Sequence, residues 1–145
     1  MFQIRDTAAI KQLKIKNLLE KDVLTVQVSG TLVDMIPLIK KSKRNMFVVL
    51  DEQKTFIGLV LLDDLRSDMF NRDKYDRPIS DYLYSPMDDE KVPLSHDVQE
   101  IINKFNRSGS YNMVVLDGSK YVGIVSRANV LKAYRENMIS GFDEY

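Results

Sequence analysis

The fold is decided by the stretch YNMVVLDGSKYVGIVSRANVL, residues Tyr111–Leu131, because a closely related stretch occurs earlier in the chain. The earlier stretch is RNMFVVLDEQKTFIGLVLLDDL, residues Arg44–Leu65. The tetrapeptide VVLD stands at 48–51 and again at 114–117, an offset of 66 (114 − 48). A repeat at a fixed offset indicates that the chain contains two copies of one structural unit.

The hairpin in the second copy has a shorter turn than the hairpin in the first. Gly58 and Gly123 follow the repeated tetrapeptides at an offset of 65 (123 − 58), one less than the tetrapeptides themselves. One residue is therefore missing from the second turn, where hairpin length changes at little cost.

An amphipathic helix is predicted upstream of each hairpin. Apolar residues recur at i, i+3, i+4 and i+7 in both copies; they are Leu32, Met35, Ile36 and Ile39, and Val98, Ile101, Ile102 and Phe105. Ser95 is the predicted N-cap of the second of these helices. Pro37 lies inside the first, where it removes one backbone hydrogen bond and is expected to bend the axis.

Each copy thus reads as a strand, a helix, a two-strand hairpin and a second helix. The predicted elements are 23–28, 31–41, 46–50, 56–61 and 63–70 in the first copy, and 91–93, 97–106, 112–116, 121–125 and 128–138 in the second. Since one copy of about 60 residues would be marginally stable alone, we expect an α+β fold of two βαββα repeats packed as a pseudo-twofold pair. The predicted division is a lead-in segment (1–14), repeat 1 (15–70), a linker (71–78), repeat 2 (79–138) and a tail (139–145).

Composition limits the class of protein. Apolar residues make up 44% of the 145 residues and charged residues 29%, which suits a soluble protein with a packed interior. Lysine plus arginine and aspartate plus glutamate number 21 each, so no net field attracts nucleic acid or anionic lipid. There is no cysteine, which excludes disulfides and thiolate chemistry. The longest apolar run, Phe56–Leu62, is far below the ~20 residues of a membrane helix, and no signal peptide is visible.

The order of these elements resembles a tandem pair of cystathionine-β-synthase (CBS) domains. The likeness extends from about Ile15 to Glu136, with GLVLLDDL closing the first copy and GIVSRANV the second. Two longer segments, 44–76 and 120–138, are similar to the cytoplasmic C-terminal CBS pair of bacterial CLC-type chloride channels and proton-coupled chloride transporters. Three features make this narrower likeness more specific than a general CBS match: DDLRSDMF at 63–70, the nearby Tyr75 and Asp76, and the run SRANVLKAYR at 126–135.

The resemblance implies a regulatory module without catalytic residues. CBS pairs often form dimers, and the clefts between their repeats often hold adenosine-containing ligands. In the family pattern Gly-h-h-Ser/Thr-x-x-Asp, where h is apolar, the hydroxyl serves the phosphate and the carboxylate serves the ribose. A helix N-terminus suits phosphate, and a carboxylate accepts from two vicinal hydroxyls.

Each copy keeps half of that pattern. The first has Asp64 but Leu61 in place of the hydroxyl, while the second has Ser126 but Asn129 in place of the acid. Arg127 adjoins Ser126 and could neutralise a phosphate. The candidate nucleotide-binding residues are Asp64, Asn112, Ser126, Arg127 and Asn129.

Structural roles stay open for the same residues. Ser126 could simply cap the last helix without binding a ligand, and Asn129 could face solvent. The acidic run 88–90 is expected to be a solvated loop, and His96, the only histidine, lacks companions at metal-ligand spacing. Tyr111 and Tyr121 could stack on a base, although hairpin tyrosines more often pack across strands. No P-loop, GxGxxG, HExxH or nucleophile elbow is present, so neither catalytic nor metal-binding residues are predicted.

Two classes of function remain. In the first, the chain is the regulatory part of a CLC-type chloride transport protein at the cytoplasmic face of the membrane. It would act as a homodimer joined to the transmembrane chloride-transport domain of the same chain, without nucleic acid. No cofactor is required, and ATP, ADP or AMP is the candidate regulatory ligand. In the second, it is a structural dimerisation domain without a ligand, or a free-standing CBS pair that regulates another partner.

Overall fold

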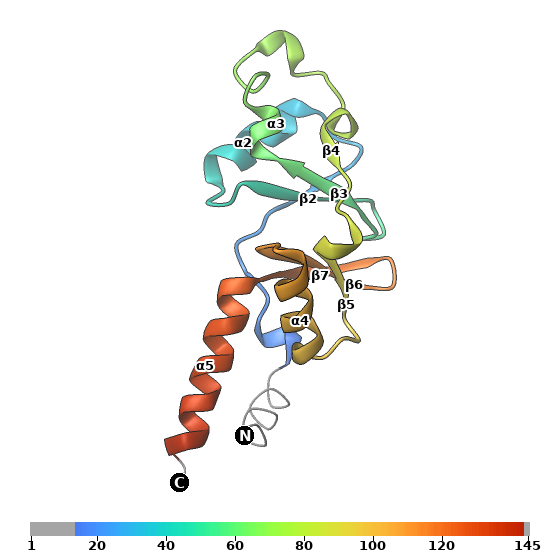
Figure 1. Cartoon of the computed structure of the whole chain (residues 1–145). Coiled ribbons are helices and arrows are strands. Elements are labelled where there is room, and N and C mark those ends of the chain that lie inside the picture. Colours follow the sequence, from blue (N-terminus) through green and yellow to red (C-terminus); the bar gives the residue numbers. More distant parts are fainter. Residues whose placement is uncertain (1–13, 144–145) are drawn as a thin grey trace. The chain divides into compact units, whose positions relative to one another are not determined.

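The computed structural model describes residues 14–143, and the side chains of these residues as far as position 136. The described chain forms two compact units (Figure 1). Unit 1 comprises residues 14–20, 87–118 and 122–143, and unit 2 comprises Lys21–Pro86 and Ser119–Tyr121. Each unit therefore combines segments that are distant in the sequence.

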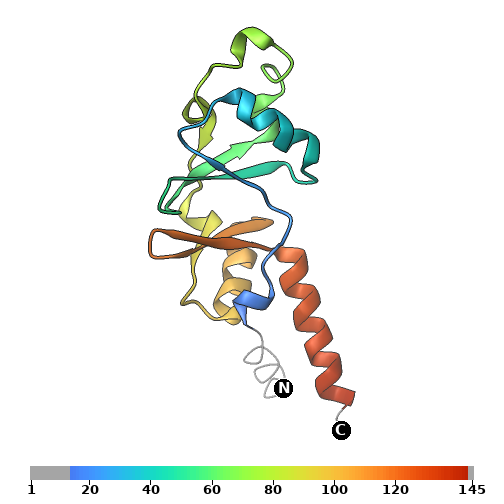
Figure 2. The same ribbon diagram turned by 180° about the vertical axis from the view of Figure 1, so that it is seen from behind.

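Unit 2 is built on a four-stranded sheet in the order β1-β2-β3-β4. Strands β1 and β2 are parallel, and β2, β3 and β4 follow antiparallel to one another. Helices α2 and α3 pack against this sheet (Figure 2). The elements are β1 (Thr25–Gln27), α2 (Leu32–Lys41), β2 (Met46–Leu50), β3 (Phe56–Leu61), α3 (Leu62–Leu65) and β4 (Leu83–Tyr84), with 3-10 turns η2 (Arg72–Lys74) and η3 (Ile79–Tyr82).

Helix α2 begins with a capping interaction and has the predicted C-terminal end. The Asp34 carboxylate accepts a hydrogen bond from the Thr31 N–H at 2.9 Å, which stabilises the first turn. The helix runs through Pro37 to Lys41. Its apolar side chains Leu32 and Met35 are buried against the sheet residues Phe47, Val49 and Val60.

Unit 1 is built on a three-stranded sheet in the order β5-β6-β7. Strand β5 runs parallel to β6. The elements are η1 (Ile15–Asn17), η4 (Asp88–Glu90), β5 (Lys91–Pro93), α4 (Val98–Ser108), β6 (Asn112–Asp117), β7 (Lys120–Ser126) and α5 (Arg127–Asp143). Among residues 14–143, no helix has the length and apolar character needed to cross a membrane.

Helix α4 has defined caps at both ends. Asp97 accepts from the Glu100 N–H at 2.8 Å, and the Glu100 side chain accepts from the Asp97 N–H at 3.0 Å. This reciprocal pair is a capping box. The helix ends at Gly109, whose φ of 72° is a left-handed conformation that glycine adopts without strain. The predicted cap Ser95 is therefore wrong, because Asp97 and not Ser95 bonds the first turn.

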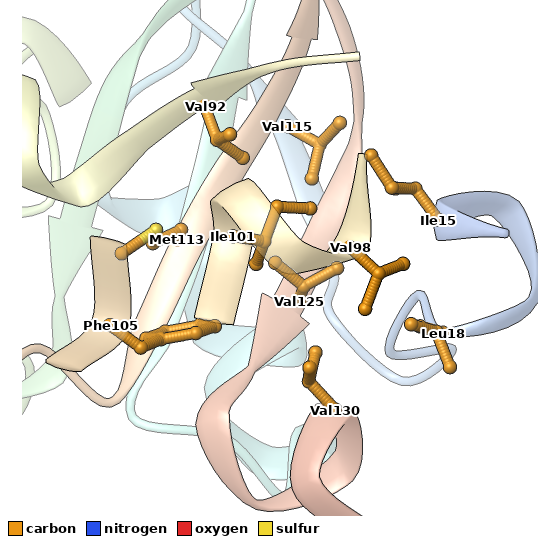
Figure 3. Packing of buried hydrophobic residues seen from close by; sticks show 10 residues of the cluster. All are labelled: Ile15, Leu18, Val92, Val98, Ile101, Phe105, Met113, Val115, Val125 and Val130. Carbon is orange, nitrogen blue, oxygen red and sulfur yellow. The ribbon is translucent and has the colours of Figure 1, made fainter. Parts of the chain in front are cut away.

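The core of unit 1 fills the space between α4 and the sheet (Figure 3). Residues from α4, from β5 to β7, from the start of α5 and from the segment 15–18 form one cluster: Ile15, Leu18, Val92, Val98, Ile101, Phe105, Met113, Val115, Val125 and Val130. Since Val115 and Val125 are fully buried, the strands predicted from the repeat do supply the core.

The first residues of each repeat pack in the unit that is built mainly from the other repeat. Residues 15–20 belong to unit 1, where Ile15 and Leu18 are buried and Leu19 pairs with Val125. Residues 79–84 belong to unit 2, where Ile79 is fully buried and β4 extends the sheet. Sequence repeats and packing units are thus different divisions of the chain.

Several predicted elements differ in length from the observed ones. Strand β1 spans only Thr25–Gln27, and α3 ends at Leu65, whereas a helix over 63–70 was predicted. Residues 66–70 form turns in place of the predicted helix. Helices α4 and α5 are longer than predicted, extending to Ser108 and Asp143.

Candidate functional site

Ser126 joins strand β7 to helix α5. Its hydroxyl oxygen accepts a hydrogen bond from the Asn129 backbone N–H at 3.1 Å. This contact satisfies one of the unpaired N–H groups of the first helical turn. The prediction that Ser126 caps the last helix is confirmed.

Glu20 contacts the same hydroxyl. The Ser126 O–H donates to Glu20 Oε1 at 2.5 Å, and the Glu20 N–H donates to the Ile124 carbonyl at 2.8 Å. Sequence analysis did not single out Glu20, since 106 residues separate it from Ser126. The only available signal was the correspondence between the first residues of the two repeats, KNLLE at 16–20 and SDYLY at 80–84.

Arg127 turns its guanidinium toward the C-terminal end of α4. Its Nη2 donates to the Phe105 carbonyl, and its Cζ lies 5.9 Å from the Phe105 ring centre and 5.5 Å from the Tyr111 ring centre. Its backbone N–H donates to the Tyr111 carbonyl at 2.8 Å, while its buried Nε lacks a partner among the described residues. A cation at a helix C-terminus is favourably placed against the helix dipole.

Asn129 lies in the first turn of α5 and is half-buried. Its Nδ2 donates to the Leu18 carbonyl at 2.9 Å, so the alternative in which Asn129 simply faces solvent is wrong. Its Oδ1 accepts no hydrogen bond from the described residues. Asn112 begins β6 next to Tyr111, whose carbonyl binds Arg127. Asn112, Ser126, Arg127 and Asn129 therefore lie near the same end of strands β6 and β7 in unit 1.

Asp64 belongs to unit 2 and stands in α3, directly after β3. Its side chain is exposed and makes no hydrogen bond or ion pair with the described residues. The adjacent Asp63 instead pairs with Arg66 at 2.7 Å. Asp63 is therefore engaged within its own helical turn, whereas Asp64 keeps a free carboxylate.

The tyrosines considered as base-stacking residues differ in environment. Tyr121 stacks on Phe56 within unit 2, with ring centres 6.4 Å apart, and burial raises its pKa to about 12. This contact confirms the predicted packing between strands. Tyr111 is 75% exposed and covers the guanidinium of Arg127.

Further features do not extend the candidate site. A hollow of about 410 Å³ in unit 1 is lined by Asp88, Lys91, Val92, Pro93, Lys104, Leu116 and Gly118, none of them a candidate residue. His96 lies 3.7 Å from the Glu100 carboxylate. In the described part of the chain, no three His, Cys, Asp or Glu side chains are placed to hold a metal ion.

The fold and the two copies of the glycine-containing hairpin define the class of protein. The sequence profile of the CBS domain matches residues 15–71 and again 79–136. The chain therefore belongs to the CBS domain family and contains a tandem pair of these domains. A comparison with curated protein sequences gives no significant match.

Solved structures share this fold at low sequence identity. The CBS domain of a bacterial CNNM/CorC family Mg²⁺ transporter in complex with ATP has a TM-score of 0.69 and 16% identity, over 91% of this chain and 94% of that chain. CbpB from Streptococcus agalactiae has a TM-score of 0.74 and 15% identity, over 100% and 93%. Staphylococcus aureus OpuCA has a TM-score of 0.67 and 19% identity, over 85% and 98%. At these identities the likeness establishes the fold alone.

Proposed function

We propose that this CBS pair is a regulatory module that binds an adenine nucleotide or a related adenosine compound. One observation carries the proposal: Asn129 Oδ1 and the Asp64 carboxylate accept no hydrogen bond from the described residues. Each lies in the helical turn that follows the glycine-containing strand of its repeat. The two vicinal hydroxyls of ribose are donors that match such acceptors.

The comparison with solved structures supports a nucleotide as the ligand. The CBS domain of the Mg²⁺ transporter was solved in complex with ATP. Asp64 and Ser126 also stand at the positions that the family pattern gives to a carboxylate and a hydroxyl. An affinity difference between two arrangements of the module would allow the ligand to regulate an attached protein.

Thermal unfolding with ATP, ADP, AMP, adenosine and S-adenosylmethionine tests this proposal. A ligand at 100 times its Kd stabilises by about 2.7 kcal/mol, and at this size each kcal/mol raises the melting temperature by about 2–4 °C. Asp64→Ala and Asn129→Ala should each reduce the shift. Asp63→Ala is the matched control, because Asp63 is already paired with Arg66. The proposal fails if none of the five compounds raises the melting temperature of the unmodified chain.

We further propose that the module is the cytoplasmic part of a CLC-type chloride channel or proton-coupled transporter and acts as a homodimer. The similarity of segments 44–76 and 120–138 to such proteins supports this assignment. An in-frame transport domain encoded upstream would agree with it, and its absence would favour a free-standing CBS pair. Light scattering of the purified chain should give twice the 16.8 kDa mass of one chain, and the monomer mass would contradict the homodimer.

A structural dimerisation domain is the second candidate function. It is favoured by the contacts of Ser126 and Arg127, which bond Glu20 and Phe105 within the protein. A dimer whose melting temperature responds to none of the adenosine compounds would identify this function.

A further inference from the structure

The hollow of about 410 Å³ in unit 1 lies at the end of β6 that is farther from Ser126. Leu116 and Gly118 line it at the C-terminal end of this strand. Ser126 lies near the other end, where the Arg127 N–H donates to the Tyr111 carbonyl. The volume falls within the range of about 300–1,000 Å³ that is usual for small-molecule sites. The hollow is therefore separate from the candidate nucleotide site.

Strands β5 and β6 supply the apolar part of the lining. Val92 is 1% exposed in the core of unit 1, and Pro93 and Leu116 are register partners beside it. Strand β5 is one edge of its sheet, but Pro93 has no N–H and the Lys91 carbonyl accepts a hydrogen bond from Lys104. Since these features leave few backbone groups for a further strand, the edge suits a small molecule better than an extended peptide.

Two ammonium groups in the lining keep hydrogen-bond donors for a ligand. Lys104 Nζ carries three donors and gives one of them to the Lys91 carbonyl, while the described residues supply no acceptor for the other two. Lys91 Nζ lies 3.9 Å from Asp88 Oδ1, which is longer than a hydrogen bond. Because the Asp88 side chain is fully exposed, this ion pair contributes little.

The charges of the lining favour an anion. Lys91 and Lys104 are half-buried, so water screens their charges less than it screens the exposed carboxylate of Asp88. Asp89 and Asp117 are close in sequence to lining residues but do not line the hollow. Ammonium groups only donate hydrogen bonds, and carboxylate and phosphate oxygens accept them.

We propose that this hollow is a second ligand site, which binds a small organic anion. The carboxylate or phosphate group of the ligand bonds Lys91 and Lys104. Its apolar part packs against Val92, Pro93 and Leu116. This site goes beyond the proposed function and does not depend on nucleotide binding near Ser126.

Nuclear magnetic resonance titration of the ¹⁵N-labelled 145-residue chain with four compounds of similar shape tests the proposal. The probes are benzoate, phenyl phosphate, neutral benzamide and cationic benzylammonium. Benzoate and phenyl phosphate should shift the amide resonances of Val92, Leu116 and Gly118 with Kd values of about 1 mM. They should leave Ser126 and Asn129 unchanged. Benzamide and benzylammonium should bind about tenfold or more weakly.

Substitution of the lysines assigns the binding to the hollow. Lys91→Met and Lys104→Met keep the apolar stem but remove the charge, and each should weaken benzoate by about tenfold. Lys132→Met, at an exposed position of α5, is the matched control and should leave the affinity unchanged. Lys91→Met keeps the backbone carbonyl that Lys104 contacts, so it carries the test in case Lys104→Met fails to fold.

Three results would overturn the proposal. The first is that benzamide or benzylammonium binds as tightly as benzoate, because the lysine charges would then not select the ligand. The second is that no anion at about 10 mM shifts the resonances of the hollow, or that neither lysine substitution weakens binding. The third is that adenosine displaces benzoate, since the hollow would then not be a separate site.

Discussion

Gly58→Ala should destabilise the protein more than Gly123→Ala, although the two glycines are equivalent in the repeat. A Cβ at Gly58 would lie 2.9 Å from Leu83 Cδ2 and 3.0 Å from the Tyr84 carbonyl oxygen. At Gly123 it would lie 3.0 Å from both Cδ atoms of Leu19. The Leu19 side chain can rotate, whereas the Tyr84 carbonyl belongs to β4, which is paired with β3.

The magnitude follows from these distances. At Gly58 the backbone oxygen must retreat by 0.4 Å, from 3.0 Å to the 3.4 Å of ordinary contact. Inserting a methyl group into a packed site costs about 1–3 kcal/mol, and replacing glycine returns about 0.4–1 kcal/mol through the unfolded chain. We expect a net loss of about 1–2 kcal/mol for Gly58→Ala, but about 0–1 kcal/mol for Gly123→Ala because Leu19 yields.

Thermal unfolding of the two variants, followed by circular dichroism, measures this difference. Gly58→Ala should lower the melting temperature by about 2–8 °C, at 2–4 °C per kcal/mol. Amide hydrogen exchange should show lost protection in β4 for this variant. An equal or larger decrease for Gly123→Ala would refute the argument from backbone rigidity.

Three further changes are predicted from single contacts. Asp97→Ala should cost about 0.5–2 kcal/mol of the free energy of unfolding by removing the capping box with Glu100, while Ser95→Ala should change it little; thermal melts in which Ser95→Ala is the more harmful would contradict the observed cap. Val115→Asp should abolish cooperative unfolding, since the side chain is fully buried, and a melt at unchanged temperature would show that the strand face is wrongly assigned. Burial raises the pKa of Tyr121 to about 12, so its contribution to stability is complete below pH 10 and is lost as the pH rises toward 12. Tyr121→Phe should remove that part of the alkaline pH dependence, and an unchanged profile would show that this phenol is not its source.

The hairpins could be predicted from the sequence almost residue by residue. Strands β2 and β3 have the predicted bounds. Strand β6 is one residue longer than predicted at its C-terminal end, and β7 is one residue longer at each end. Both copies place a short apolar run between turn residues, and such runs are typical of buried strands. Because the same pattern occurs in both repeats, the strand assignment in one repeat supports the assignment in the other.

The packing partners of the first residues of each repeat, 15–20 and 79–84, could not be predicted. Leu19 pairs with Val125, and β4 pairs with β3. These partners are distant in the sequence, and a short apolar segment does not indicate which strand it will pair with. The candidate site was incomplete for the same reason. Ser126 and Asn129 follow from the glycine-containing pattern, whereas Glu20 reaches them only through the pairing of its segment with β7.

The placement of residues 15–20 in unit 1 affects the order in which the protein can fold during synthesis. Lys21–Pro86 contains all four strands of its sheet and can begin to pack once it has left the ribosome. Ile15 and Leu18 are made earlier, but most of their partners lie in residues 92–130, so their contacts must close long loops. Residues that are synthesised before the rest of both repeats are thus among the last of the pair to be buried, and Glu20 reaches Ser126 only after most of the second repeat has been translated.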